Sequence, residues 1–179
     1  MPRRLLDALY WAGAAVAALA LLGIFLLMMA QVVLRELGIQ LPGADDLVAY
    51  LCVASAFFAL AFTFRRGELI RVGLGIERVP PGMRRWAEAA VLALAAAITA
   101  TIVWWTWQDA MFSLEIEEVA QGTVPFPIWI PKLSMPLGSG LLLLALLEEL
   151  WRVAVAARKP AYVAAAEERA ARGDFSAEV

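Results

Sequence analysis

Long apolar stretches separated by short polar ones dominate the pattern along this chain. Four apolar runs cover roughly residues 10–34, 47–64, 86–108 and 128–150, and no Asp, Glu, Lys or Arg lies near the middle of any run. A helix that crosses the hydrocarbon core of a bilayer needs about 20 predominantly apolar residues. The pattern therefore predicts an all-α membrane protein with four transmembrane helices.

Basic residues are concentrated in alternate connectors between these runs. The N-terminal segment, the connector between the second and third runs and the C-terminal tail hold 13 of the 15 Lys and Arg residues, and the other connectors hold only Arg35 and Lys132. Because cytoplasmic connectors are enriched in Lys and Arg, we expect both termini to be cytoplasmic. Residues 1–158 then form a four-helix membrane domain, and residues 159–179 form a cytoplasmic tail.

The composition excludes several classes of function. The chain has 179 residues, of which 63% are hydrophobic, with a formal net charge of −2, a single cysteine and no histidine. Haem ligation by two histidines is therefore impossible, and a lone Cys52 forms no disulfide within the chain. A net charge this close to zero gives no indication of the basic surface that nucleic-acid binding requires. We expect no cofactor, no bound metal and no catalytic residue.

The middle of each run is chemically inert, which bears on function. Intramembrane charged groups usually mark ion or substrate pathways. Glu88 is the only carboxylate placed for such a role, and it falls in the first turn of the third run, where it can stay near the interface. A membrane protein without a working group of its own is expected to assist a partner that has one.

The connector after the second run carries the most distinctive sequence of the chain, RRGELIRV at 65–72. A lipid anchor, in which each basic residue contributes about 1 kcal/mol, requires only its charges. The order of the residues remains unexplained by charge, and docking to a partner protein is the second interpretation. The interface candidates here are Arg65, Arg66, Gly67, Glu68, Ile70 and Arg71.

Small residues in the third run supply a further candidate surface. Ala89, Ala93 and Ala97 recur four residues apart, a spacing that lets helix backbones approach closely in lipid. The face serves either a partner, with Ala93 at its centre, or packing among the chain's own helices.

The start of the second run and the start of the fourth run hold the remaining candidates. Asp46 precedes the second run, where a carboxylate caps a helix and interacts favourably with its dipole; contact with a partner is the alternative. Pro131 and Pro136 lie at the start of the fourth run, where missing backbone donors cost least, and Gly138, Ser139 and Gly140 make the outer half of this run thin and easy to bend. A partner helix or a lipid would fill that space.

Three strings together resemble the small membrane subunit (DctQ type) of TRAP transporters, the tripartite ATP-independent periplasmic carriers. They are LPGADDLVAY at 41–50, RGELIRV at 66–72, and PIWIP at 127–131 followed by PLG at 136–138. The resemblance covers about residues 5–155 and rests on the order and spacing of the strings within a four-span layout. The chain departs from the family pattern in having Asp46, Leu69 and Gly73 where Glu, His and Asp are usual.

The resemblance implies a specific role. Such carriers combine a periplasmic binding protein that captures an organic acid, a large membrane subunit that holds the substrate and sodium sites, and a small subunit that braces the large one. A member would be a multi-pass protein of the bacterial inner membrane with no enzymatic activity. Its partners would be the large subunit, the binding protein and the lipid bilayer.

Two other functions remain open. A self-sufficient four-span exporter would need an embedded carboxylate for proton exchange, and Glu88 is the sole candidate. A membrane anchor of a redox complex would usually ligate haem, which the absence of histidine opposes.

Overall fold

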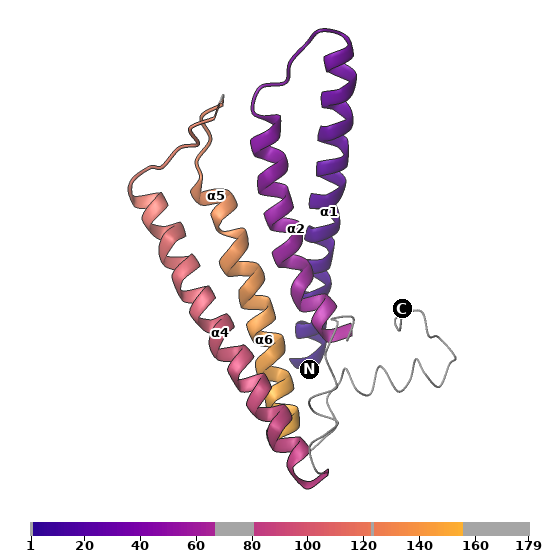
Figure 1. Cartoon of the computed structure of the whole chain (residues 1–179), viewed down its shortest axis with the longest axis vertical. Helices are drawn as coiled ribbons and strands as arrows, with labels where there is room; N and C mark the ends of the chain where they lie inside the picture. Colours follow the sequence, from indigo (N-terminus) through magenta and orange to yellow (C-terminus); the bar gives the residue numbers. More distant parts are fainter. Residues whose placement is uncertain (1, 67–80, 123, 156–179) are drawn as a thin grey trace, which may run out of the picture.

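The computed structural model describes residues 2–66, 81–122 and 124–155 of the chain (Figure 1). Its helices are α1 (Pro2–Glu36), α2 (Ala44–Arg66), α4 (Pro81–Glu115), α5 (Trp129–Lys132) and α6 (Ser134–Ala154). Four helical segments in this part of the chain are long and apolar enough to cross a membrane, with α5 and α6 together forming the fourth. The prediction of an all-helical chain with four helices long and apolar enough to span a membrane is confirmed.

The helices are longer than the apolar runs from which they were predicted. α1 and α4 have 35 residues each, which corresponds to about 52 Å of helix at 1.5 Å per residue. A hydrocarbon core is only about 30 Å thick, so these helices tilt or extend beyond it. The runs 10–34 and 86–108 end at polar residues, whereas the backbone hydrogen bonding continues past them.

The four long helices form a single row in the order α4, α6, α2, α1 (Figure 1). α6 packs between α4 and α2, α1 packs along α2, and α1 barely touches α6. In the most apolar window of each segment, 33% of residues are buried in the α5–α6 segment but only 6% in α1. The protein is therefore a layer one helix thick, with α1 and α4 as its edges.

We name the two ends of the layer by the helix ends and connectors that lie there. The terminal end holds the start of α1, the end of α2, the start of α4 and the end of α6; the loop end holds the connectors 37–43 and 116–128 (Figure 1).

At the loop end α1 stops at a Schellman motif, in which Ile39 N–H donates to the Leu34 carbonyl (2.9 Å) and Gly38 N–H to the Arg35 carbonyl (3.0 Å). Gly38 supplies the positive φ of 73° that this motif requires.

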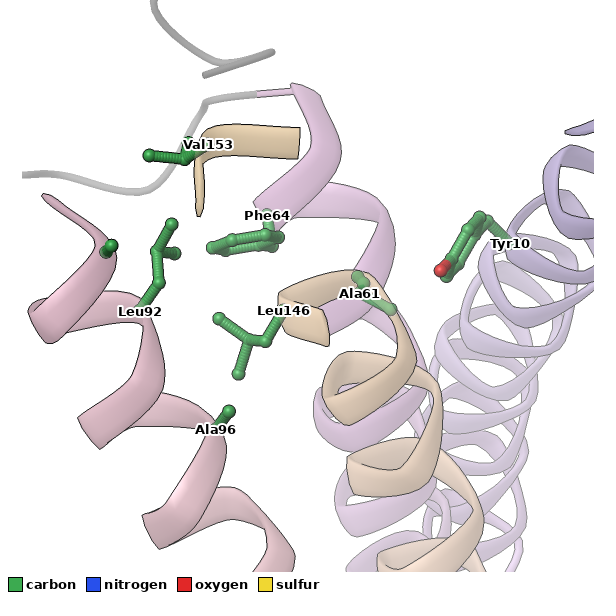
Figure 2. Close-up of a cluster of buried hydrophobic side chains, with 9 residues drawn as sticks. Tyr10, Ala61, Phe64, Leu92, Ala96, Leu146 and Val153 are labelled. Carbon is green, nitrogen blue, oxygen red and sulfur yellow. The ribbon is translucent and has the colours of Figure 1, made fainter. Parts of the chain in front are cut away.

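Apolar packing concentrates at the terminal end (Figure 2). Phe64 of α2, Leu92 of α4 and Leu146 and Val153 of α6 form the centre of the cluster, and Tyr10 of α1 lies beside it. The members contributed by α4, namely Ala89, Leu92 and Ala96, follow the three-and-four spacing of one helix face. This cluster fixes the helix order at the terminal end.

The fourth span begins with two helical segments, α5 and α6. The helix is interrupted at Leu133, between α5 and α6, where Pro131 and Pro136 each lack a backbone N–H donor. Gly138 lies inside α6, and a Cβ built on it would come within 2.6 Å of the Phe57 backbone of α2. The space beside Gly138 is therefore filled by the chain's own α2.

Candidate partner interface

Arg65 and Arg66 end α2 and lie against the first turns of α1. Arg65 pairs with Asp7 (Nη1 to Oδ1, 2.6 Å) and its guanidinium lies 4.5 Å from the centre of the Tyr10 ring. Arg66 lies over the Trp11 ring of α1, with 5.9 Å between the guanidinium carbon and the ring centre, and over the Phe62 ring of its own helix at 4.4 Å. The two arginines thus bind α2 to α1 through charge and ring contacts, and they line an open groove of about 330 Å³.

The other candidates from this connector are Gly67, Glu68, Ile70 and Arg71, which lie outside the described residues. Their proposed role in docking stays a prediction.

The alanine face of the third span divides in the structure. Ala89 is buried against α6, whereas Ala93 and Ala97 are exposed. Trp86 and Trp104, exposed by 66% and 63%, fall on the same side of α4 as Ala93, because helical residues about seven and eleven positions apart share a face. We call the exposed set Trp86, Ala90, Ala93, Ala97, Ala100 and Trp104 the α4 alanine face. It is a smooth strip flanked by two aromatic rings, and no other part of the described chain covers it.

The described residues of the connector, 116–122 and 124–128, form a small hairpin at the loop end. Val119 and Pro127 form an isolated antiparallel bridge, and Ala120 N–H donates to the Phe126 carbonyl (2.8 Å). The Phe126 ring stacks on Tyr50 of α2, with 6.3 Å between ring centres. No pattern in the sequence predicts this hairpin, because its pairing depends on tertiary contact with α2.

Asp46 connects this hairpin to α2. It lies in the first turn of the helix, as expected for a residue that interacts with the helix dipole. Its carboxylate also lies so close to Gly122 that a Cβ there would overlap it. Pro131 is half-buried in α5 beside the hairpin, whereas Pro136 and Gly138 are buried within the layer.

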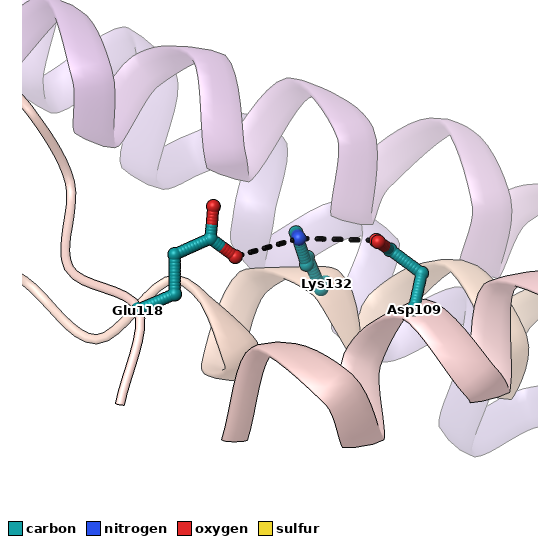
Figure 3. Close-up of polar contacts among 3 residues, drawn as sticks. All are labelled: Asp109, Glu118 and Lys132. Atoms are coloured by element: carbon teal, nitrogen blue, oxygen red, sulfur yellow. Dashed lines mark hydrogen bonds and ion pairs between the residues drawn. The ribbon is translucent and has the colours of Figure 1, made fainter. Parts of the chain in front are cut away.

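A charged triad that the sequence analysis missed joins three segments of the loop end (Figure 3). Lys132 Nζ lies 3.1 Å from Asp109 Oδ2 of α4 and 2.9 Å from Glu118 Oε2 of the hairpin. The hydrogen bond from Lys132, with a smaller contribution from Ser113, holds the pKa of the Glu118 carboxyl below its usual value. Only the individual charges were visible in the sequence, because 14 residues separate Glu118 from Lys132.

Two carboxylates are buried in the layer. Glu88 is 8% exposed, and its carboxylate lies 3.4 Å from Arg84. Because α4 begins at Pro81, Glu88 lies about two turns inside the helix instead of in its first turn, as the shorter predicted span implied. Glu149 is 5% exposed and lies 3.9 Å from Arg152. Both acids belong to the terminal end, and among the described residues no group of three metal-ligating side chains forms.

The comparison with known families decides the identity of the chain. The sequence model of the tripartite ATP-independent periplasmic transporters, DctQ component, matches residues 24–156. The chain belongs to this family. A search of the curated proteins finds no match. The DctQ-family match confirms the resemblance found in the strings at 41–50, 66–72 and 127–138.

Family membership establishes the general role of the chain. DctQ components are transport subunits and not enzymes, and with its four apolar helices this DctQ-family chain is a multi-pass membrane protein. It is the small subunit type of a TRAP transporter, a class that works with a large membrane subunit and a binding protein.

Proposed function

We propose that this chain is the static brace of a sodium-coupled TRAP transporter in the bacterial inner membrane, which imports an organic acid. It holds the scaffold of the large membrane subunit and helps to dock the periplasmic binding protein. The observation that carries the proposal is the single-layer arrangement of the helices. A layer of this kind has little interior, and its exposed apolar faces offer packing area to a partner in the bilayer.

The distribution of charge supports a brace over a pump. The buried carboxylates Glu88 and Glu149 both lie near the terminal end, and each has an arginine within one helical turn. A proton or ion pathway needs polar groups across the membrane interior. We therefore assign the substrate and sodium sites to the large subunit, and we find no support for an exporter that uses Glu88.

We assign the α4 alanine face to contact with the large subunit. Small side chains allow a partner helix to approach the backbone closely, and helices in lipid associate through such packing. α4 is an edge of the layer and packs substantially only on the α5–α6 segment. The α4 alanine face is therefore left uncovered by the described part of the chain.

We infer that the terminal end is cytoplasmic and that the loop end faces the periplasm. Arg65, Arg66, Arg84 and Arg85 all lie at the terminal end, in agreement with the enrichment of basic residues in cytoplasmic connectors. The hairpin, Asp46 and Pro131 are then on the side from which the binding protein approaches. The triad of Lys132, Asp109 and Glu118 would keep this surface rigid for docking.

Copurification tests the brace. The chain is co-expressed with its large subunit, an affinity tag is placed on the large subunit alone, and the complex is purified in mild detergent. We expect the two proteins in equal amounts, and the tagged large subunit of an unrelated TRAP transporter serves as the control. A chain that never accompanies its large subunit would contradict the proposal.

Cysteine accessibility tests the orientation. Cys52→Ser removes the native thiol, and a new cysteine is placed at Glu36 of the loop end or at Arg84 of the terminal end. A membrane-impermeant maleimide added to intact cells should label Glu36→Cys, and Arg84→Cys only after permeabilisation. The reverse pattern would overturn the assignment of the two sides.

A further inference from the structure

A groove at the loop end is separate from the hairpin, the charged triad and the α4 alanine face. It has a volume of about 760 Å³ and lies between the last turns of α1, the connector 37–43 and the start of α2. Its lining combines charged, amide and apolar side chains, among them Arg35, Asp45, Gln31, Met28 and Val32. We call it the α1–α2 groove.

The groove presents a cation and an anion at the level where the helices end. Arg35 lies in the last turn of α1 and Asp45 in the first turn of α2. Gln31 Nε2 donates a hydrogen bond to Asp45 Oδ1 (2.9 Å), which orients the carboxylate and leaves its second oxygen available. Within the described part of the chain, the Arg35 side chain has no ion pair or hydrogen bond.

The wall of the groove becomes apolar toward the membrane interior. Val32 lies about one turn from Arg35 along α1, and Met28 about two turns, or roughly 10 Å deeper. Both side chains are about half exposed, at 57% and 49%. A ligand that fits this gradient has a charged head at Arg35 and Asp45 and a hydrocarbon part along Val32 and Met28.

We propose that the α1–α2 groove binds one phospholipid with a phosphoethanolamine headgroup, its phosphate on Arg35, its ammonium on Asp45 and an acyl chain along Val32 and Met28. Arg suits the phosphate because its planar guanidinium donates two parallel hydrogen bonds to such an anion. Asp45 favours the zwitterionic headgroup, because its carboxylate pairs with the ammonium group, which an anionic lipid such as phosphatidylglycerol lacks. The proposal requires only that the helices span a bilayer, and not the proposed transport role.

Native mass spectrometry of the full chain in mild detergent tests the site. Phosphatidylethanolamine or phosphatidylglycerol is added at equal concentration, with soluble glycerophosphoethanolamine as a third ligand. We expect a single phosphatidylethanolamine adduct, a weaker phosphatidylglycerol adduct and no adduct of the soluble headgroup. Arg35→Gln should weaken the phosphatidylethanolamine adduct about tenfold, the loss expected for one charge-assisted contact.

The chain offers a matched control for this variant. Glu36 is the neighbouring charged residue on the same exposed helix end and does not line the groove, so Glu36→Gln should leave the adduct unchanged. Asp45→Asn should abolish the preference for phosphatidylethanolamine over phosphatidylglycerol while lipid still binds. Val32→Asp, an exposed change, should lower binding of both lipids.

Three results would overturn the proposal. The first is an adduct in Arg35→Gln as strong as in the unchanged chain. The second is equal binding of the soluble headgroup, which would make the site one for a free phosphate compound. The third is a photo-crosslinker at Val32 that captures the large subunit instead of lipid when the whole transporter is used.

Discussion

Gly138 is the residue at which the helix packing tolerates least change. A Cβ there would lie 2.6 Å from both the Phe57 backbone carbon and the Phe57 Cβ, whereas a Cβ on Gly140 meets nothing within 4 Å. Gly138→Ala should therefore destabilise the chain by about 1–3 kcal/mol, as overpacking does. Thermal unfolding in detergent measures the loss.

Gly140→Ala is the matched control, because it adds the same methyl group two positions away in the same helix. It should leave stability unchanged or raise it slightly, since Ala favours helix over Gly. Equal behaviour of the two variants would mean that α2 and α6 do not approach closely at Gly138.

Arg65 and Asp7 hold the ends of α1 and α2 together. Arg65→Glu removes their ion pair and the contact with Tyr10 and places two acids side by side. Because both side chains are partly exposed, we expect a loss of only about 1–2 kcal/mol in unfolding free energy. The double variant Asp7→Arg with Arg65→Glu should recover the ion-pair share of this loss, and no recovery would mean that the pair contributes nothing.

Protonation of Glu118 should lower the stability of the hairpin at the loop end. Its pKa is lowered from 4.5, chiefly by the hydrogen bond from Lys132, so its contribution is present above 4.5 and is lost as the pH falls through the lower folded-state pKa. We expect the amides of Ala120 and Ile128, which form hairpin hydrogen bonds, to lose exchange protection as the pH falls below 4.5. Hydrogen exchange corrected for intrinsic rates measures this.

The variant Lys132→Met tests whether the loss of exchange protection at low pH comes from the contact between Glu118 and Lys132. The variant should show weak protection of the hairpin at all pH values, because Glu118 has lost its partner. A decline of protection below pH 4.5 that persists unchanged in Lys132→Met would place its origin elsewhere in the protein.

At the scale of the element, one face of α4 packs against α6, and another, the α4 alanine face, is exposed. Ala93 is exposed and Val91 is exposed by 56% on another side of the helix. Ala93→Leu should leave the unfolding temperature of the isolated chain unchanged and reduce copurification with the large subunit several-fold, because the added side chain prevents close helix approach. Val91→Leu should leave both quantities unchanged.

This pair of variants distinguishes packing against a partner from packing within the chain. If Ala93→Leu lowers the unfolding temperature of the isolated chain, the alanine face belongs to the interior. If copurification is the same for Ala93→Leu and Val91→Leu, the large subunit binds another surface of the layer.

The helices themselves could be predicted from the sequence, and their surroundings only in part. Each apolar run is long enough to require a span, so α1, α2, α4 and the α5–α6 segment follow from local composition. The division of the alanines into buried Ala89 and exposed Ala93 depends on the side of α4 that meets α6, which no periodicity decides in so alanine-rich a helix. The triad at Lys132 and the hairpin likewise depend on segments that meet only after folding.

At the scale of the molecule, the long helices form a layer one helix thick. α1 and α4 each have one substantial neighbour, and large apolar side chains of both edges remain exposed. Lipid can cover these edges, but a layer of this form gains buried area and rigidity when a partner covers one face. This shape supports the proposal that the chain extends a larger membrane protein.

Solute flux into proteoliposomes tests most directly whether this chain is a brace without transport activity of its own. Vesicles contain this chain alone, the large subunit alone or both, and uptake of a labelled organic acid is measured with the binding protein outside and an inward sodium gradient. We expect no uptake by the chain alone and sodium-dependent uptake only when both subunits are present. Uptake by the chain alone, or full uptake by the large subunit without it, would show that the chain is not a brace that the transporter requires.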